Sequence, residues 1–135
     1  LAVLQFEKHS PADDGAVRQA ALAALDAARH LKHVILVDED VDIFNSNDLL
    51  WALATRYQGD YSTIFLPGMR GHISDPSQSP EFSPLLRAPV TTCKTIFDCT
   101  VPFALKERFR RPEFAPVDLS KFPELSLYFN NSARA

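Results

Sequence analysis

The segment that most constrains the fold runs from His33 to Tyr57 and reads HVILVDEDVDIFNSNDLLWALATRY. It begins with a continuous apolar run, which is typical of a strand buried on both faces. Four carboxylates follow within a few residues. A helix is predicted next, because Asn45, Ser46 or Asn47 can cap its first turn. A buried strand, an acidic turn and a capped helix in this order are typical of an α/β domain.

Predicted strands and helices alternate along the rest of the chain. Strands are expected over residues 1–8, 61–66 and 90–100, and helices over residues 16–30 and 104–109. Asp13 or Asp14 is expected to cap the first helix, whose alanine-rich stripe suits close packing on a sheet. Five prolines and two glycines predict an irregular connection between residues 67 and 89. The alternation predicts a three-layer α/β sandwich, with helices flanking a mixed, largely parallel sheet.

Length and charge exclude several classes of protein. A chain of 135 residues suits one domain. A net charge of −3 without a basic stripe argues against nucleic-acid and membrane partners, and no apolar run approaches the roughly 20 residues of a membrane span. Cys93 and Cys99 are expected about 20 Å apart on one strand, too far for a disulfide. They are therefore interpreted as reduced thiols of a cytoplasmic protein.

The strand-like opening without methionine indicates a part of a longer protein.

Asp38, Glu39, Asp40 and Asp42, which we call the acidic run, are the first candidate functional residues. They follow a buried strand, and ligands of open α/β sheets bind at that edge. In an extended backbone Asp38, Asp40 and Asp42 would share one face. Their negative charges repel one another unless a cation, an arginine or solvent compensates them. The residues favour a solvated or ion-paired turn, while a divalent-metal site and an inter-domain contact remain alternatives.

A phosphatase is a further hypothesis for the acidic run. Haloacid-dehalogenase-type phosphatases open with an apolar strand that ends in Asp-x-Asp-Val, which makes Asp38 a nucleophile and Asp40 an acid/base. Such an enzyme also needs a downstream lysine and a second acidic pair at strand ends. Lys94 lies in the middle of a predicted strand and Asp98 stands alone. This hypothesis is therefore the weakest of those considered.

His72 is the second candidate, within the glycine-containing segment PGMRGHISDP. A histidine at a loop tip can reach a ligand and titrate near neutral pH. The neighbouring Arg70 is able to bind a carboxylate. On residue types alone, an exposed His72 without a role is favoured. The other three histidines flank helix or strand ends and are expected at the surface.

Several motifs follow one another along the chain. They are VDEDVD at 37–42, LWALATR at 50–56, PG at 67–68, DPS at 75–77 and TIFDCT at 95–100 followed by Pro102. Together they resemble the C-terminal domain of the UbiD family of reversible, non-oxidative decarboxylases, over about residues 2–115. The FDCT segment, residues 97–100, is most similar to the branch that acts on hydroxybenzoic acids such as protocatechuate or gallate.

The resemblance implies a complete enzyme that holds prenylated FMN, a divalent metal (manganese or magnesium) and potassium. The family's catalytic Glu-Arg-Glu set and its flavin and metal ligands lie in upstream domains. No catalytic or metal-binding residue is therefore expected in this chain, which should be inactive alone. The implied partners are the upstream flavin-binding domain, a small aromatic carboxylic acid and further copies in a homo-oligomer, a dimer or larger.

The resemblance also implies roles for the candidate residues. His72 occupies the position that faces the aromatic ring, where it would hydrogen-bond a ring hydroxyl, with Arg70 as a less certain substrate contact. Asp38, Asp40, Asp42 and Trp51 become a structural junction. The domain is expected to span residues 1–115, and the tail at 116–135 to pack on it or on a neighbouring subunit. A stand-alone, non-catalytic small subunit or binding module with the same fold is the alternative.

Overall fold

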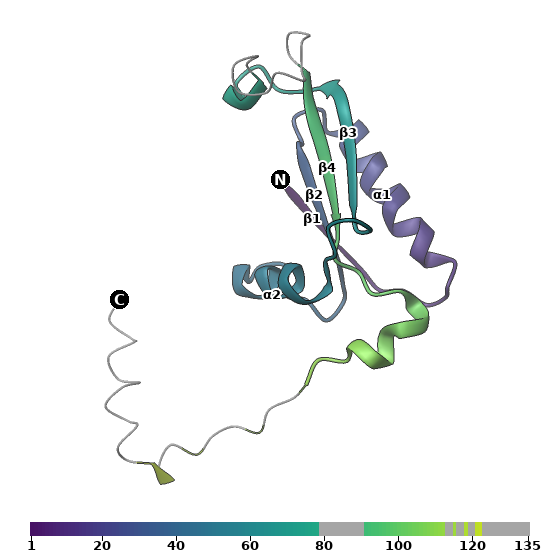
Figure 1. The fold of residues 1–135 in the computed structure, drawn as a ribbon, viewed down its shortest axis with the longest axis vertical. Coiled ribbons are helices and arrows are strands. Elements are labelled where there is room, and N and C mark those ends of the chain that lie inside the picture. The colour runs from purple at the N-terminus through teal and green to yellow at the C-terminus, as the bar shows by residue number, and fades with distance from the viewer. Residues whose placement is uncertain (79–90, 113–114, 116–117, 119–120, 123–135) are drawn as a thin grey trace.

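A mixed sheet forms the centre of the molecule (Figure 1). The computed structural model describes residues 1–78, 91–112, 115, 118, 121 and 122. The strands lie in the order β1-β2-β4-β3, with β1, β2 and β4 parallel and β3 antiparallel to β4. In chain order the elements are β1 (Ala2–Phe6), α1 (Asp13–Ala27), β2 (His33–Asp38), α2 (Ser46–Arg56), β3 (Thr63–Arg70), the 3-10 helix η1 (Pro76–Gln78), β4 (Thr91–Asp98) and the 3-10 helix η2 (Phe103–Phe109).

The two α-helices lie on opposite sides of this sheet (Figure 1). Alternate residues of a strand point to opposite faces, so the apolar run of β2 supplies both cores. One core is formed by α1 and alternate strand residues, namely Val17, Ala21, Leu25, Val34, Leu36 and Ile96. The other lies under α2 and comprises Ile35, Val37, Val41, Ala52 and Cys99. The predicted three-layer sandwich with a mixed, largely parallel sheet is confirmed.

The start of α1 differs from the prediction, whereas that of α2 agrees with it. The Asn45 side chain accepts a hydrogen bond from the Asn47 backbone N–H at 3.0 Å, which caps α2 as expected. At α1 the N-cap position is Ala12, which makes no side-chain cap. Asp13 lies inside the helix and accepts hydrogen bonds from the backbone N–H groups of His9 and Ser10, both at 2.8 Å. This carboxylate therefore fixes the loop before α1.

Strand β3 is longer than predicted, because it continues through the Pro67-Gly68 dipeptide to Arg70. Its pairing with β4 is interrupted between Leu66 and Met69 and then resumes. Gly68 has φ of 72°, which glycine adopts without steric cost. Proline is tolerated where a bulge breaks the ladder, so this dipeptide shapes the strand and does not end it.

The two cysteines are free thiols, as predicted. Cys93 is half-buried and Cys99 is buried, and burial raises the pKa of the Cys99 thiol to about 12. None of the helices in the described ranges is long and apolar enough to cross a membrane. The predicted packing of the tail at 116–135 falls almost entirely outside the described residues, and the division of the chain at residue 115 stays a prediction.

Candidate functional site

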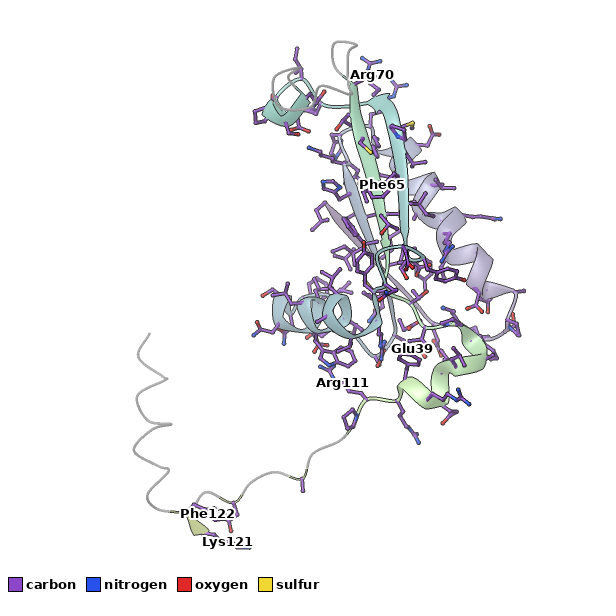
Figure 2. All side chains as sticks on the ribbon, viewed as in Figure 1. Glu39, Phe65, Arg70, Arg111, Lys121 and Phe122 are labelled. Carbon is purple, nitrogen blue, oxygen red and sulfur yellow. The ribbon has the colours of Figure 1, made fainter. Side chains whose placement is uncertain are left out.

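The acidic run lies at the edge of the sheet where the parallel strands end. Asp38 is the last residue of β2, Asp98 is the last residue of β4, and Lys8 lies just beyond β1. Because these strands are parallel, all three residues reach the same edge. The sequence predicted this position correctly. Figure 2 shows Glu39 near this edge and Arg70 at the opposite end of the sheet.

Asp38 is buried, with 3% of its surface exposed. Its Oδ2 accepts hydrogen bonds from the Val101 backbone N–H at 2.7 Å and from Arg56 Nη1 at 3.4 Å. Lys8 Nζ lies 3.7 Å from Asp38 Oδ1 and donates to Asp14 Oδ1 at 3.0 Å. Burial raises the pKa of Asp38 above its ordinary value. A phosphatase nucleophile must be open to its substrate, so the position of Asp38 does not suit that hypothesis.

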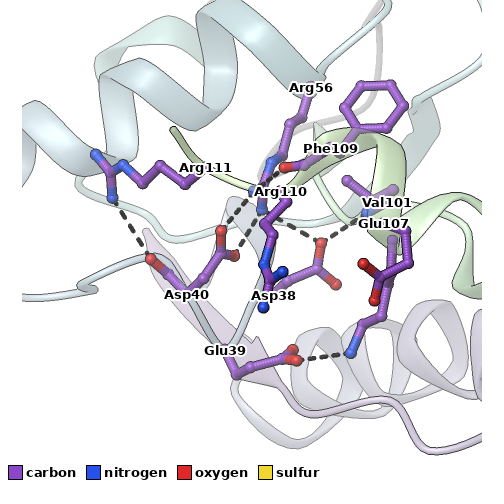
Figure 3. Close-up of a pocket in the computed structure, with 10 residues that line it drawn as sticks. Asp38, Glu39, Asp40, Arg56, Val101, Glu107, Phe109, Arg110 and Arg111 are labelled. Carbon is purple, nitrogen blue, oxygen red and sulfur yellow. Dashed lines mark hydrogen bonds and ion pairs between the residues drawn. The ribbon is translucent and has the colours of Figure 1, made fainter. Parts of the chain in front are cut away.

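The next two carboxylates pair with cations from later elements (Figure 3). Arg56, in the last turn of α2, donates from both Nη atoms to the Asp40 carboxylate, at 2.7 and 2.5 Å. Lys106 Nζ, from η2, lies 2.6 Å from Glu39 Oε1. The hydrogen bonds from Arg56 hold the pKa of Asp40 below its ordinary value. These two ion pairs tie α2 and η2 to the end of β2.

Asp42, which precedes α2, and Trp51, which lies within it, make further contacts near this edge. Asp42 Oδ1 accepts a hydrogen bond from the backbone N–H two residues later, at 2.9 Å. The guanidinium carbons of Arg56 and Arg111 lie 4.8 and 4.2 Å from the centroid of the Trp51 ring, within reach of a cation–π interaction. Arg111 Nη1 also donates to Asp48 Oδ2 at 2.9 Å. The segment after η2 is thereby fastened to α2.

The carboxylates of the acidic run are compensated by donors of this chain. Asp38 contacts Val101 and Lys8, Asp40 pairs with Arg56, and Arg56 also lies 3.4 Å from Asp38. Over the part of the chain that the structure describes, no three histidine, cysteine, aspartate or glutamate side chains are grouped so as to hold a metal ion. The described residues therefore give no support to the metal-site alternative for this edge.

His72 lies at the opposite edge, just beyond the end of β3. It is exposed, and its Nδ1 accepts a hydrogen bond from the Ser74 backbone N–H at 3.3 Å. A neutral imidazole that accepts at Nδ1 carries its proton at Nε2, which can then donate to a ligand. An open pocket of about 450 Å³ lies here, lined by Arg29, His30, Arg70, Gly71, His72 and Ile73.

A short polar network holds the loop that carries His72. Asp75 Oδ1 accepts hydrogen bonds from the Ser77 backbone N–H at 3.0 Å and from the Ser77 hydroxyl at 2.7 Å. Lys32 Nζ, just before β2, lies 2.8 Å from Asp75 Oδ2. The hydrogen bond from Lys32 holds the pKa of Asp75 well below its ordinary value. The Asp-Pro-Ser motif thus fixes the loop against the sheet edge.

Some residues at the two edges were not predicted from the sequence. Arg29 and His30 line the same pocket as His72, although His30 had only been expected to lie at the surface. Lys8 and Arg56 were not recognised as the cations that compensate Asp38. Each is far from its partner in the sequence, and no local motif marks such a pair. Only the topology of the sheet brings them together.

Comparison with known proteins places the chain in a family of carboxy-lyases. Residues 1–99 match the family described as the 3-octaprenyl-4-hydroxybenzoate carboxy-lyase C-terminal domain, UbiD_C. The chain is 46% identical to a gallate decarboxylase of Lactiplantibacillus plantarum over 118 residues, 87% of this chain and 24% of that protein.

Solved structures have the same fold. A 3,4-dihydroxybenzoic acid decarboxylase from Enterobacter cloacae superposes with a TM-score of 0.80 and 57% identity, covering 91% of this chain and 25% of that one. A UbiD-class enzyme from Pelotomaculum thermopropionicum, in complex with FMN, gives a TM-score of 0.69 and 25% identity over 89% of this chain and 25% of its own. The chain thus spans about a quarter of the length of these relatives.

Proposed function

The chain belongs to the UbiD family as its C-terminal domain, and on this premise we propose that it is part of a reversible, non-oxidative decarboxylase of a hydroxybenzoic acid. The observation that carries the proposal is the high identity to a gallate decarboxylase and to a 3,4-dihydroxybenzoic acid decarboxylase, 46% and 57%. Both relatives are named for acids whose aromatic ring carries adjacent hydroxyl groups. The substrate class is therefore a small, hydroxylated aromatic carboxylic acid.

The complete enzyme would use prenylated FMN, a divalent metal (manganese or magnesium) and potassium. FMN in the Pelotomaculum relative supports a flavin, which supplies the group that activates the substrate for loss of carbon dioxide. The described residues of this chain do not fit a metal site, since they contain no suitable group of ligands. We assign the flavin, both ions and the catalytic residues to the upstream flavin-binding domain. This chain alone would then be inactive.

Within such an enzyme the chain would form one wall of the substrate pocket, through His72. The Nε2 proton of the neutral imidazole would donate to a ring hydroxyl and so select a hydroxylated ring. Arg70, which lines the same pocket, would be a weaker substrate contact. The hydrogen bonds within the Asp-Pro-Ser motif would hold the loop in place while the substrate binds.

The opposite edge would serve structure and assembly. Asp38, Asp40, Asp42 and Trp51 would form a junction that joins β2, α2 and η2, as their internal partners support. The domain would contribute to a homo-oligomer in the cytoplasm, a dimer or larger.

Replacement of His72 tests the proposed substrate contact in the full-length enzyme. A lost buried hydrogen bond costs roughly 1–3 kcal/mol, so His72→Ala should lower kcat/KM on 3,4-dihydroxybenzoate by about ten- to a hundredfold. The matched control is His9→Ala, an exposed histidine beyond the other edge of the sheet, which should leave the rate unchanged. An unaltered rate for His72→Ala would reject its role as a substrate contact.

A further inference from the structure

The pocket beside His72 has an unusual charge distribution for a protein whose net charge is −3. Two arginines and two histidines line it, and none of its lining residues is acidic. Arg29 and His30 follow the end of α1, while Arg70 ends β3 and His72 follows it. Two elements that are distant in the sequence thus bring four basic side chains to one concave surface.

The arginines of this pocket differ from Arg18 and Arg56 at the acidic edge, which have carboxylate partners within the chain. Arg18 pairs with Asp98 at 2.6 Å, and Arg56 pairs with Asp40 at 2.5 Å. For Arg29 and Arg70, the described part of the chain offers no carboxylate within ion-pair distance. Asp75, the carboxylate of the adjoining loop, is already engaged by Lys32. Among the described residues, therefore, no carboxylate competes with an external anion for either guanidinium group.

The end of α1 would ordinarily disfavour an anion, because a helix C-terminus carries partial negative charge. Lys94 offsets this charge in the present fold. It is buried, with 2% of its surface exposed, and its Nζ donates to the carbonyl oxygens of Leu25 at 2.9 Å and Arg29 at 3.2 Å. With these carbonyl groups bound from inside, the outer surface of the helix end presents the side chains of Arg29 and His30.

We propose that the pocket between the end of α1 and the end of β3 binds an oxyanion, the carboxylate or phosphate group of a small ligand, through Arg29 and Arg70. A guanidinium group offers paired N–H donors that match two oxygens of such a group. His30 and His72 add donors at the rim. This site shares His72 with the proposed substrate contact. Anion binding is measured without turnover, so a test of this proposal can fail or succeed independently of the proposed decarboxylase activity.

Anion titration of the full-length protein tests this proposal. Inorganic phosphate and benzoate are titrated separately by calorimetry into the wild type, Arg29→Gln, Arg70→Gln and the double variant. Each single substitution removes charge-assisted hydrogen bonds to the anion and should weaken its binding roughly tenfold. Arg70→Lys, which keeps the charge and loses the paired donors, should fall between wild type and Arg70→Gln. The two titrants distinguish a site for phosphate groups from one for carboxylates.

The matched control is Arg108→Gln, which removes an exposed arginine of η2 at the far edge of the sheet. It should leave both affinities unchanged. Equal weakening by the control would show that general charge attracts the anions and would contradict the proposal. Failure of both anions to bind the wild type would also overturn it. If the wild type binds neither anion and the double variant has a lower melting temperature than the wild type, the arginines stabilise the fold through contacts within the protein. That result would also contradict the proposal.

Discussion

At the scale of single residues, the acidic run separates into carboxylates with different environments. Asp38 is withdrawn from water behind Val101 and Lys8, and its pKa is raised by burial. Asp40 meets Arg56 at the surface, and its pKa is lowered by that contact. The sequence predicted an ion-paired or solvated turn without identifying any partner. Ion pairs between residues that are distant in the sequence depend on where the fold places their side chains, and a local sequence pattern does not give those positions.

Arg56 is the residue on which this edge depends most. Its side chain is 4% exposed and serves Asp38, Asp40 and the Trp51 ring together. Arg56→Gln should therefore destabilise the domain by roughly 3 kcal/mol, because it removes one of the two cations beside the buried Asp38 and both hydrogen bonds to the Asp40 carboxylate. Hydrogen exchange of the β2 and α2 peptides measures the loss. Arg110→Gln, at an exposed neighbouring arginine, should have little effect on this exchange. If the β2 and α2 amides were equally protected from exchange in both variants, the stabilising role of Arg56 would be contradicted.

Asp48 provides a prediction about acid stability. Its hydrogen bonds from Arg111 lower its pKa from 3.8 to about 2, so between these values the folded state binds fewer protons than the unfolded state. The stabilisation is complete above pH 3.8 and is lost as the pH falls toward 2. The urea concentration at the midpoint of unfolding, measured against pH, should therefore change less between pH 3.8 and about 2 in Asp48→Asn than in the wild type. Asp60→Asn, in an exposed turn, serves as the control, and an unchanged curve for Asp48→Asn would refute the coupling.

At the scale of elements, local patterns predicted most of the fold. The apolar run of β2, the alanine-rich stripe of α1 and the Asn45 cap of α2 agree with the structure. The prediction failed at Pro67-Gly68, which was interpreted as the end of a strand. Pairing with β4 resumes beyond this dipeptide, so tertiary contacts override the local preference for a turn. Long-range pairing of this kind is not visible in a single segment.

Lys94 links the end of α1 to the sheet. This role could not be predicted either, since a lysine in a strand is usually exposed. Its ammonium group instead binds the carbonyl oxygens at the end of α1. Lys94→Met keeps the volume but leaves those oxygens unpaired, at a cost of roughly 1–3 kcal/mol. Faster hydrogen exchange in the last turn of α1 would report the change. Lys121→Met, at a side chain that is 73% exposed, should be neutral.

At the scale of the whole molecule, the two edges of the sheet have opposite characters. The edge at the ends of β1, β2 and β4 compensates its carboxylates internally and supports a structural role. The edge at the end of β3 presents His72 and two arginines without internal ion pairs in the described ranges. Ligand sites are commonly expected at the first edge. The antiparallel direction of β3 instead carries the candidate substrate contact to the second edge.

The central claim is that this domain forms part of an enzyme that removes carbon dioxide from hydroxybenzoic acids. The most direct measurement is release of carbon dioxide from 3,4-dihydroxybenzoate by the full-length protein loaded with prenylated FMN, with flavin absorbance confirming the loading. We predict turnover of this acid and much slower turnover of benzoate, which has no ring hydroxyl for His72 to bind. A flavin-loaded protein that releases no carbon dioxide from 3,4-dihydroxybenzoate or gallate would contradict the claim.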